Sequence, residues 1–256
     1  MRRPSRTRLE WLLPLLVPVL FVAYWKASII IYKMPSWYLP SPEQVLLRLW
    51  TSKTIWLHTQ MTLTEMLIGF GVAILTGIVT AVLIDRSRMV EKAVYPYVIV
   101  MQAIPISAIA PMLVIWLGFG LAPRVVAAAV LGFYPIVRNT REGFKAVDYR
   151  LLELMESINA SAWQVYSKVK IPTALPYIFS GLSIAAPLAL IGATVAEFFG
   201  YDKGLGYLVQ LSTAQFETDL SLAVVGVLAF IGISSFAIFN WIERAFPGRA
   251  SKGKTQ

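Results

Sequence analysis

The chain carries six apolar runs that are long enough, or nearly long enough, to cross a membrane. They cover residues 11–32, 66–84, 94–119, 125–137, 174–199 and 221–242. A membrane helix needs about 20 apolar residues to span a hydrocarbon core of about 30 Å. The fourth run is short and needs Pro123, Arg124 and Arg138 as interfacial flanks. We predict an all-α fold, a polytopic membrane helix bundle with about six transmembrane helices, in one domain over residues 1–256.

The formal net charge of +9 is explained by topology. If the N-terminus is cytoplasmic and six spans alternate, the cytoplasmic segments hold 17 of the 23 Lys and Arg residues. This bias sets the orientation of membrane proteins. We therefore expect both termini in the cytoplasm, as basic tails at residues 1–10 and 244–256. The excess positive charge predicts contact with anionic lipid headgroups and no nucleic-acid partner.

The first run follows four arginines, as the apolar part of a signal peptide would. It is too long for that part and lacks an Ala-x-Ala cleavage site, so we expect a retained first helix. In the outer segment 36–60, Ser41 can cap a helix that has Pro42 at its first position. Apolar residues recur there with helical spacing, which predicts an amphipathic helix from Glu43 to about Leu57 on the outer surface.

The second run carries a small residue at every fourth position. These residues are Gly69, Ala73, Gly77 and Ala81. Small residues let another helix approach closely, which favours packing between membrane helices. We expect that partner to be a helix of the same chain rather than of a second subunit.

The third run is interrupted by Pro105 and Pro111, with Gln102 and Ser107 beside them. Proline removes a backbone donor, and the freed carbonyls must find partners in protein or in a water-filled cavity. Broken helices are also where transporters place substrate. Gln102, Pro105 and Ser107 are therefore candidate pathway residues, and a purely structural kink is the alternative.

The fifth run contains Pro187, which we expect to break its helix late, and it ends at Glu197. An acid at the end of an apolar run is costly unless it is paired or faces water. Glu197 is therefore a candidate for the outer mouth of a pathway. The alternative is that it simply marks the membrane boundary.

Residues 248–255 match the phosphate-loop pattern GxxxxGK[ST]. That loop needs a strand before it and a helix after it. Here a membrane helix precedes the match and Gln256 alone follows, so we interpret it as a solvated basic tail. His58, the single histidine, has no companion ligands and is assigned to the outer surface. We expect no catalytic residue, metal site or cofactor in this chain.

The cytoplasmic segment 138–172 is polar and shows ordered helix signals. A first helix is expected over about Tyr149–Ile158, and Asn159 follows in a left-handed turn. Ser161 and Gln164 fit a capping box for a second helix, which should continue to about Lys170 and stop before Pro172. Two short helices joined by a tight turn form a rigid projection, which is suited to docking on a partner.

The spacing within this segment resembles the EAA loop of binding-protein-dependent ABC transporter permeases. That loop reads Glu-Ala-Ala, three residues, Gly, nine residues, and Ile-x-Leu-Pro. The matching positions are Glu153, Asn159, Val169, Ile171 and Pro172. Leu154 and Met155 replace the two alanines, and Asn159 replaces the glycine. Other motifs resemble the nitrate/sulfonate/taurine branch over about residues 36–243, among them Trp116-Leu117-Gly118-Phe119-Gly120 and Ala196-Glu197-Phe198-Phe199-Gly200.

The resemblance implies a subunit of a type I importer in the plasma (inner) membrane of a bacterium or archaeon. Two permease subunits, expected to be identical, would line the pathway. Separate ATPase subunits would hold ATP and Mg²⁺, and an external substrate-binding protein would deliver the substrate. The ATPase-coupling residues would be Glu153, Asn159, Ala160, Ser161, Ala162, Trp163 and Gln164. The branch suggests a small anion such as nitrate, a sulfonate or taurine, or else a vitamin precursor.

The alternative function is a self-sufficient secondary transporter or channel driven by an ion gradient. Such proteins usually carry ionisable residues deep in the membrane, whereas Glu65 and Glu197 lie near the ends of apolar runs. A membrane-embedded enzyme would need a nucleophile–base pair or a metal cluster, and the sequence offers no candidate for either.

Overall fold

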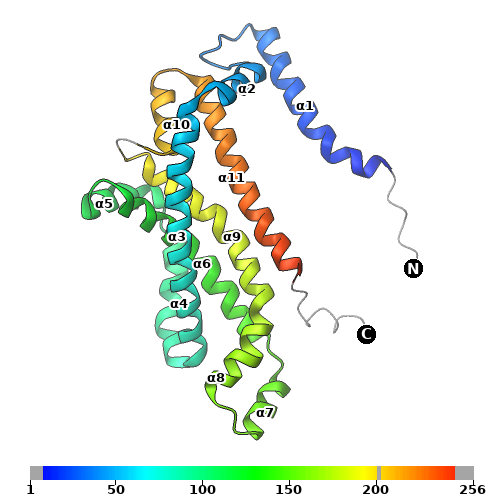
Figure 1. Cartoon of the computed structure of the whole chain (residues 1–256), viewed down its shortest axis with the longest axis vertical. Coiled ribbons are helices and arrows are strands. Elements are labelled where there is room, and N and C mark those ends of the chain that lie inside the picture. Colours follow the sequence, from blue (N-terminus) through cyan, green and yellow to red (C-terminus); the bar gives the residue numbers. More distant parts are fainter. Residues whose placement is uncertain (1–7, 201–202, 246–256) are drawn as a thin grey trace. The chain divides into compact units, whose positions relative to one another are not determined.

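The computed structural model describes residues 8–200 and 203–245, with side chains over 16–200 and 203–244, and every element in this part of the chain is a helix (Figure 1). The phosphate-loop-like residues 248–255, and most of the basic tails expected at 1–10 and 244–256, lie outside the described residues. The helices are α1 (Arg8–Tyr32), α2 (Pro42–Thr51), α3 (Lys53–Arg86), α4 (Arg88–Ala103), α5 (Ile106–Leu117), α6 (Leu121–Lys145), α7 (Tyr149–Ser157), α8 (Ala162–Val165), α9 (Ile171–Glu197), α10 (Leu205–Ala214) and α11 (Thr218–Ala245). A π-helical turn, Tyr166–Lys170, joins α8 to α9.

Four of these helices are long and apolar enough to cross a membrane. They are Lys53–Arg86, Leu121–Lys145, Ala162–Glu197, in which α8, the π-helical turn and α9 run together, and Thr218–Arg244. The bent pair α4 and α5 brings the number to five. The first run forms α1, whose apolar part with described side chains, Leu16–Tyr32, is shorter than a span. The described residues thus give four or five candidate spans, where the sequence predicted about six.

The chain divides into two compact units. Unit 1 consists of residues 1–57 and 208–226, and unit 2 consists of residues 58–207 and 227–256. In unit 1 the predicted cap of α2 is confirmed, because the Ser41 hydroxyl accepts from the amide of Gln44 and the Gln44 side chain accepts from the amide of Ser41.

The amphipathic helix expected over Glu43–Leu57 is wrong in its extent. Helix α2 ends at Thr51, Ser52 is extended, and α3 starts at Lys53. Hydroxyl side chains compete for backbone hydrogen bonds, and Thr51 Oγ1 donates to the carbonyl of Leu47 at 2.9 Å. The residues after this break therefore belong to a long membrane helix.

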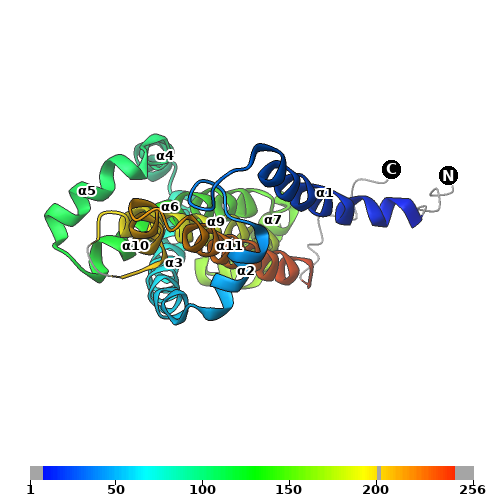
Figure 2. The ribbon, with the colours of Figure 1, turned by 90° about the horizontal axis from the view of Figure 1, so that it is seen from above.

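The core of unit 2 forms where α6 and α9 pack side by side (Figures 1 and 2). Gly192 of α9 allows the helices to approach closely because it has no side chain. A Cβ at this position would lie 2.4 Å from the carbonyl oxygen of Ala127 of α6. The small-residue stripe of α3 also packs within the chain, since a Cβ on Gly69 would lie 2.5 Å from the Cβ of Ala128. That prediction is confirmed.

The predicted break in the third run is confirmed at Ile104 and Pro105. Helix α4 ends at Ala103, α5 starts at Ile106, and the two helix axes are bent by 102°. Pro111, which was also expected to interrupt the run, lies inside α5 without ending it.

The predicted break at Pro187 is wrong, because α9 is continuous from Ile171 to Glu197. Most residues around Pro187 are buried, including Ala185, Ala186 and Ala189. Proline costs an internal hydrogen bond, but packing on neighbouring helices can keep a membrane helix intact across it.

The helix bounds within segment 138–172 also differ from the prediction. Helix α6 continues to Lys145, and the helix that begins at Ala162 does not stop before Pro172 but runs into α9. The π-helical turn carries the chain past this proline, with the amide of Ile171 donating to the carbonyl of Tyr166, five residues earlier. This difference matters because the hairpin is thereby continuous with a core helix.

Candidate functional site

Helices α7 and α8 form a helical hairpin between the end of α6 and the start of α9 (Figure 1). The Asp148 side chain caps α7 by accepting from the amide of Arg150 at 3.0 Å. Asn159 then reverses the chain with a φ of 51°, which confirms the predicted left-handed turn. Asn is the residue other than glycine that adopts this conformation at least cost.

The predicted capping box of the second helix is also present. The Ser161 hydroxyl accepts from the Gln164 amide at 3.3 Å, and Gln164 Oε1 accepts from the Ser161 amide at 2.8 Å. Two helix-starting amides are thus satisfied locally. The hairpin therefore holds its shape through contacts within its own tip.

The tip of the hairpin exposes large apolar side chains. Trp163 is 76% exposed, Ile158 is 63% exposed and Leu154 is 57% exposed. Of the candidate coupling residues, Glu153, Asn159, Ser161, Ala162, Trp163 and Gln164 are exposed, and Ala160 is half-buried. An exposed apolar patch with a polar rim is typical of a protein–protein contact.

The candidate pathway residues fall in two different environments. Gln102, Pro105 and Ser107 are all exposed and lie at the break between α4 and α5. Glu197, by contrast, has no exposed area. Gln102, Pro105 and Ser107 therefore lie on an exposed bend, whereas Glu197 lies inside unit 2. We do not propose that Glu197 lines the outer mouth of a pathway.

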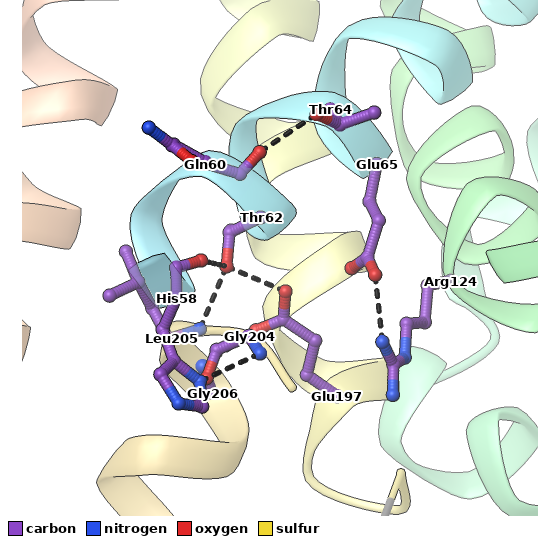
Figure 3. A network of polar contacts seen from close by, with 10 residues as sticks. All are labelled: His58, Gln60, Thr62, Thr64, Glu65, Arg124, Glu197, Gly204, Leu205 and Gly206. Atoms are coloured by element: carbon purple, nitrogen blue, oxygen red, sulfur yellow. Dashed lines mark hydrogen bonds and ion pairs between the residues drawn. The ribbon is translucent and has the colours of Figure 1, made fainter. Parts of the chain in front are cut away.

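Glu197 is the centre of a polar network at the end of α9 (Figure 3). Its Oε1 accepts from the Thr62 hydroxyl and its Oε2 accepts from the Gly206 amide, each at 2.6 Å. The Thr62 hydroxyl accepts in turn from the amide of Leu205 at 2.8 Å. The carboxylate and the hydroxyl thereby hold the turn that follows α9 against α3.

His58 is buried in the same network, which corrects its assignment to the outer surface. The amide of Gly204 donates to His58 Nδ1 at 3.0 Å, and the imidazole stacks on Tyr207 with ring centroids 6.0 Å apart. The residue is thus a satisfied core histidine that fixes the glycine turn.

Beside this network, Arg124 of α6 donates to Glu65 Oε1 of α3 at 2.8 Å (Figure 3). The sequence prediction treated both residues as features of span ends and missed their pairing. A signal was present: His58, Thr62 and Glu65 are spaced four and three residues apart, so they share one face of α3. A polar stripe inside an apolar helix indicates buried partners.

The two sites are an exposed apolar hairpin tip and a buried polar network. Over the described part of the chain, no group of three or more His, Asp or Glu side chains is placed to hold a metal ion. The hairpin presents apolar surface, and the network ties α3, α6 and α9 to the turn after α9.

Comparison with known proteins identifies the family. Residues 73–248 match the model of the binding-protein-dependent transport system inner membrane component. A probable ABC transporter permease protein of Haemophilus influenzae is 33% identical, covering 93% of this chain and 98% of its own length. The formylaminopyrimidine transport permease protein ThiX of Halalkalibacterium halodurans is 33% identical, with coverages of 90% and 92%. The taurine transport system permease protein TauC of Escherichia coli is 29% identical, with coverages of 88% and 87%.

The fold agrees with this result. An inward-facing structure of the MetNI methionine ABC transporter matches with a TM-score of 0.65, covering 79% of this chain and 96% of the matched chain at 18% identity. This match confirms the predicted helical architecture. The family model and the sequence relatives confirm the predicted branch, and these relatives are permease proteins rather than enzymes. The chain belongs to the family of binding-protein-dependent transport system inner membrane components, and it is a multi-pass permease subunit of an ABC importer.

Proposed function

We propose that the hairpin of α7 and α8 docks on the ATPase subunit of this importer and couples ATP hydrolysis to movement of the membrane helices. The observation that supports this proposal is the exposed apolar tip formed by Leu154, Ile158 and Trp163. Glu153 supplies an exposed charge beside the tip. A large aromatic side chain of this kind is a typical energetic centre of an interface.

The hairpin is built to transmit displacement. Helix α8 continues through the π-helical turn into α9, so Ala162–Glu197 forms one helical element. Helix α9 packs on α6 through buried small residues, and close-packed elements move as rigid bodies. A displacement of Trp163 by the ATPase would therefore be transmitted to α9 without an intervening flexible loop.

Co-purification of the ATPase subunits with a tagged permease tests the docking. We expect Trp163→Ala to weaken the complex by roughly 30-fold, as loss of an interface hot spot does, and Glu153→Ala to weaken it less. Trp116→Ala is the matched control, because Trp116 is similarly exposed, at 70%, but lies on α5. Unchanged co-purification of both Trp163→Ala and Glu153→Ala would exclude the hairpin as the docking site.

Site-directed cross-linking gives an independent readout, since the chain contains no cysteine. A photoreactive maleimide on Ser157→Cys, an exposed position at the end of α7 that leaves Trp163 in place, should cross-link to the ATPase subunit, whereas the same reagent on Ile115→Cys of α5 should not. The reverse labelling pattern would place the ATPase at α5.

The assembly that we propose contains two copies of this permease, two ATPase subunits that hold ATP and Mg²⁺, and an external binding protein. The bias of Lys and Arg supports an orientation with both termini and the hairpin in the cytoplasm. Gln102, Pro105 and Ser107 at the bend between α4 and α5 are the proposed pathway residues, because an exposed helix break leaves backbone carbonyls for a solute.

For the substrate, we propose a small polar vitamin precursor of the aminopyrimidine type. The formylaminopyrimidine permease supports it, with a higher identity than the taurine permease. Proteoliposomes that contain the whole complex and its binding protein should accumulate formylaminopyrimidine in an ATP-dependent manner. Accumulation of taurine instead would assign the chain to the sulfonate-type importers.

A further inference from the structure

Asp85, near the end of α3, holds two side chains of the π-helical turn. Tyr166 Oη and Lys170 Nζ both donate to Asp85 Oδ2, each at 2.6 Å. Lys170 Nζ also lies 5.0 Å from the centroid of the Tyr166 ring. These three residues, named here the Asp85 clamp, form a closed set in which every pair is in contact.

The clamp is shielded from water and anchored in the core of unit 2. The Asp85 and Lys170 side chains are mostly buried, and charge-assisted hydrogen bonds are about twice as strong as neutral ones. The Tyr166 ring packs edge-on against Phe144 of α6, with centroids 5.8 Å apart. The clamp therefore joins α3 to a turn that also contacts α6.

The position of the clamp on the chain gives it a role. The turn Tyr166–Lys170 lies directly between α8 and α9, and π-helical turns often occur at functional sites. Along the chain, this turn is the segment that connects Trp163 on α8 to α9. Because Asp85 grips both ends of the turn, a displacement of Trp163 also acts on α3.

We propose that Asp85 is a positioning residue of the transport cycle, which passes the movement of the hairpin to α3 as well as to α9. The inference rests on the proposed docking of the hairpin on the ATPase. It adds a second output, α3, to the helix that the hairpin enters directly. Other contacts also join α3 to α6 and α9, so without the clamp the response of α9 to ATP should persist and that of α3 should be weakened.

Spin labels on the two helices test this separation in the reconstituted complex. One label replaces Leu83 of α3 and a second, in a separate sample, replaces Ile184 of α9; both positions are exposed. The distance between the two copies of each label is measured by pulsed electron–electron double resonance with and without ATP, Mg²⁺ and vanadate. We expect both distances to shift in the otherwise unchanged chain, and Asp85→Asn to reduce the shift at Leu83 while the shift at Ile184 persists.

Asp85→Glu, which keeps the charge, should restore the response of α3, and Tyr166→Phe should weaken it. Tyr166→Phe removes only a hydroxyl, so it carries the same test if Asp85→Asn does not fold. Glu91→Gln is the matched control, because it breaks an ion pair with Arg141 that joins α4 to α6 and leaves the clamp intact.

Two outcomes overturn the inference in distinguishable ways. If Asp85→Asn and Tyr166→Phe both leave the shift at Leu83 unchanged, the clamp does not transmit movement, and the docking proposal is unaffected. If neither label responds to ATP in the otherwise unchanged chain and Trp163→Ala retains the ATPase, the docking proposal fails and the inference fails with it.

Discussion

Arg124 and Glu65 form an ion pair 2.8 Å long, and their side chains are only 5% and 4% exposed. The two residues are 59 positions apart, on α6 and α3. Two buried charges stabilise a fold only as a pair, because removing one partner leaves the other uncompensated in an apolar environment. The pair therefore fixes how these two helices meet.

We expect Glu65→Leu to lower the free energy of unfolding by about 3–5 kcal/mol, since it removes a buried ion-pair partner of the Arg124 guanidinium. The free energy of unfolding should fall less in the double variant Glu65→Leu with Arg124→Met, because neither buried charge remains. Thermal unfolding in detergent measures both. Arg48→Ala is the control, as its pairs with Glu217 and Asp219 are partly exposed and should contribute about 0–1 kcal/mol. Equal losses in the single and double variants would contradict this account of the pair.

Glu197 can be tested by comparing an isostere with an apolar residue. Glu197→Leu removes the acceptor of the Gly206 amide and leaves the Thr62 hydroxyl only the His58 carbonyl at 3.3 Å, and an unpaired buried donor costs about 1–3 kcal/mol. Glu197→Gln keeps one acceptor oxygen and should cost less. Hydrogen exchange at residues 204–206 should accelerate strongly in the leucine variant. Slow exchange there would show that the turn is held by other contacts.

Gly206→Ala should destabilise the turn that follows α9. A Cβ at this position would lie 2.3 Å from the carbonyl oxygen of Thr194 and 3.0 Å from the Cβ of Glu197. Gly71→Ala is the matched control, because a Cβ on Gly71 meets nothing within 4 Å and alanine stabilises a helix by up to about 1 kcal/mol. The midpoint temperature of thermal unfolding should therefore fall for Gly206→Ala and rise for Gly71→Ala. A shift in the same direction for both variants would refute the packing argument.

Asn159→Gly should leave docking of the ATPase intact, because glycine adopts a φ of 51° readily. Asn159→Val should impair docking, since a side chain in the left-handed region costs about 1–2 kcal/mol and more when it is β-branched. The Asn159 side chain is exposed, so neither change disturbs the core. Co-purified ATPase per permease is the readout. A valine variant that retains the full complement would show that the turn conformation is not needed.

Local signals in the sequence were sufficient for most of the helices and for the hairpin. The apolar runs predicted an all-α membrane protein because a backbone in lipid must satisfy its own hydrogen bonds. The caps at Ser41 and Ser161 and the left-handed turn at Asn159 were predicted correctly, because each depends on residues within four positions.

The tertiary structure decided what depends on distant partners. The sequence placed Glu65, Arg124 and Glu197 near span ends, and only the packing of α3, α6 and α9 pairs Glu65 with Arg124 and Glu197 with Thr62. Packing also kept α9 continuous through Pro187, where local rules predicted a break. The Asp85 clamp belongs to the same class, since 81 positions separate Asp85 from Tyr166. The sequence alone determined where helices form, because helix signals are local. Only the tertiary structure determined which buried charges meet and which helices pack together, because those contacts exist only after the helices pack.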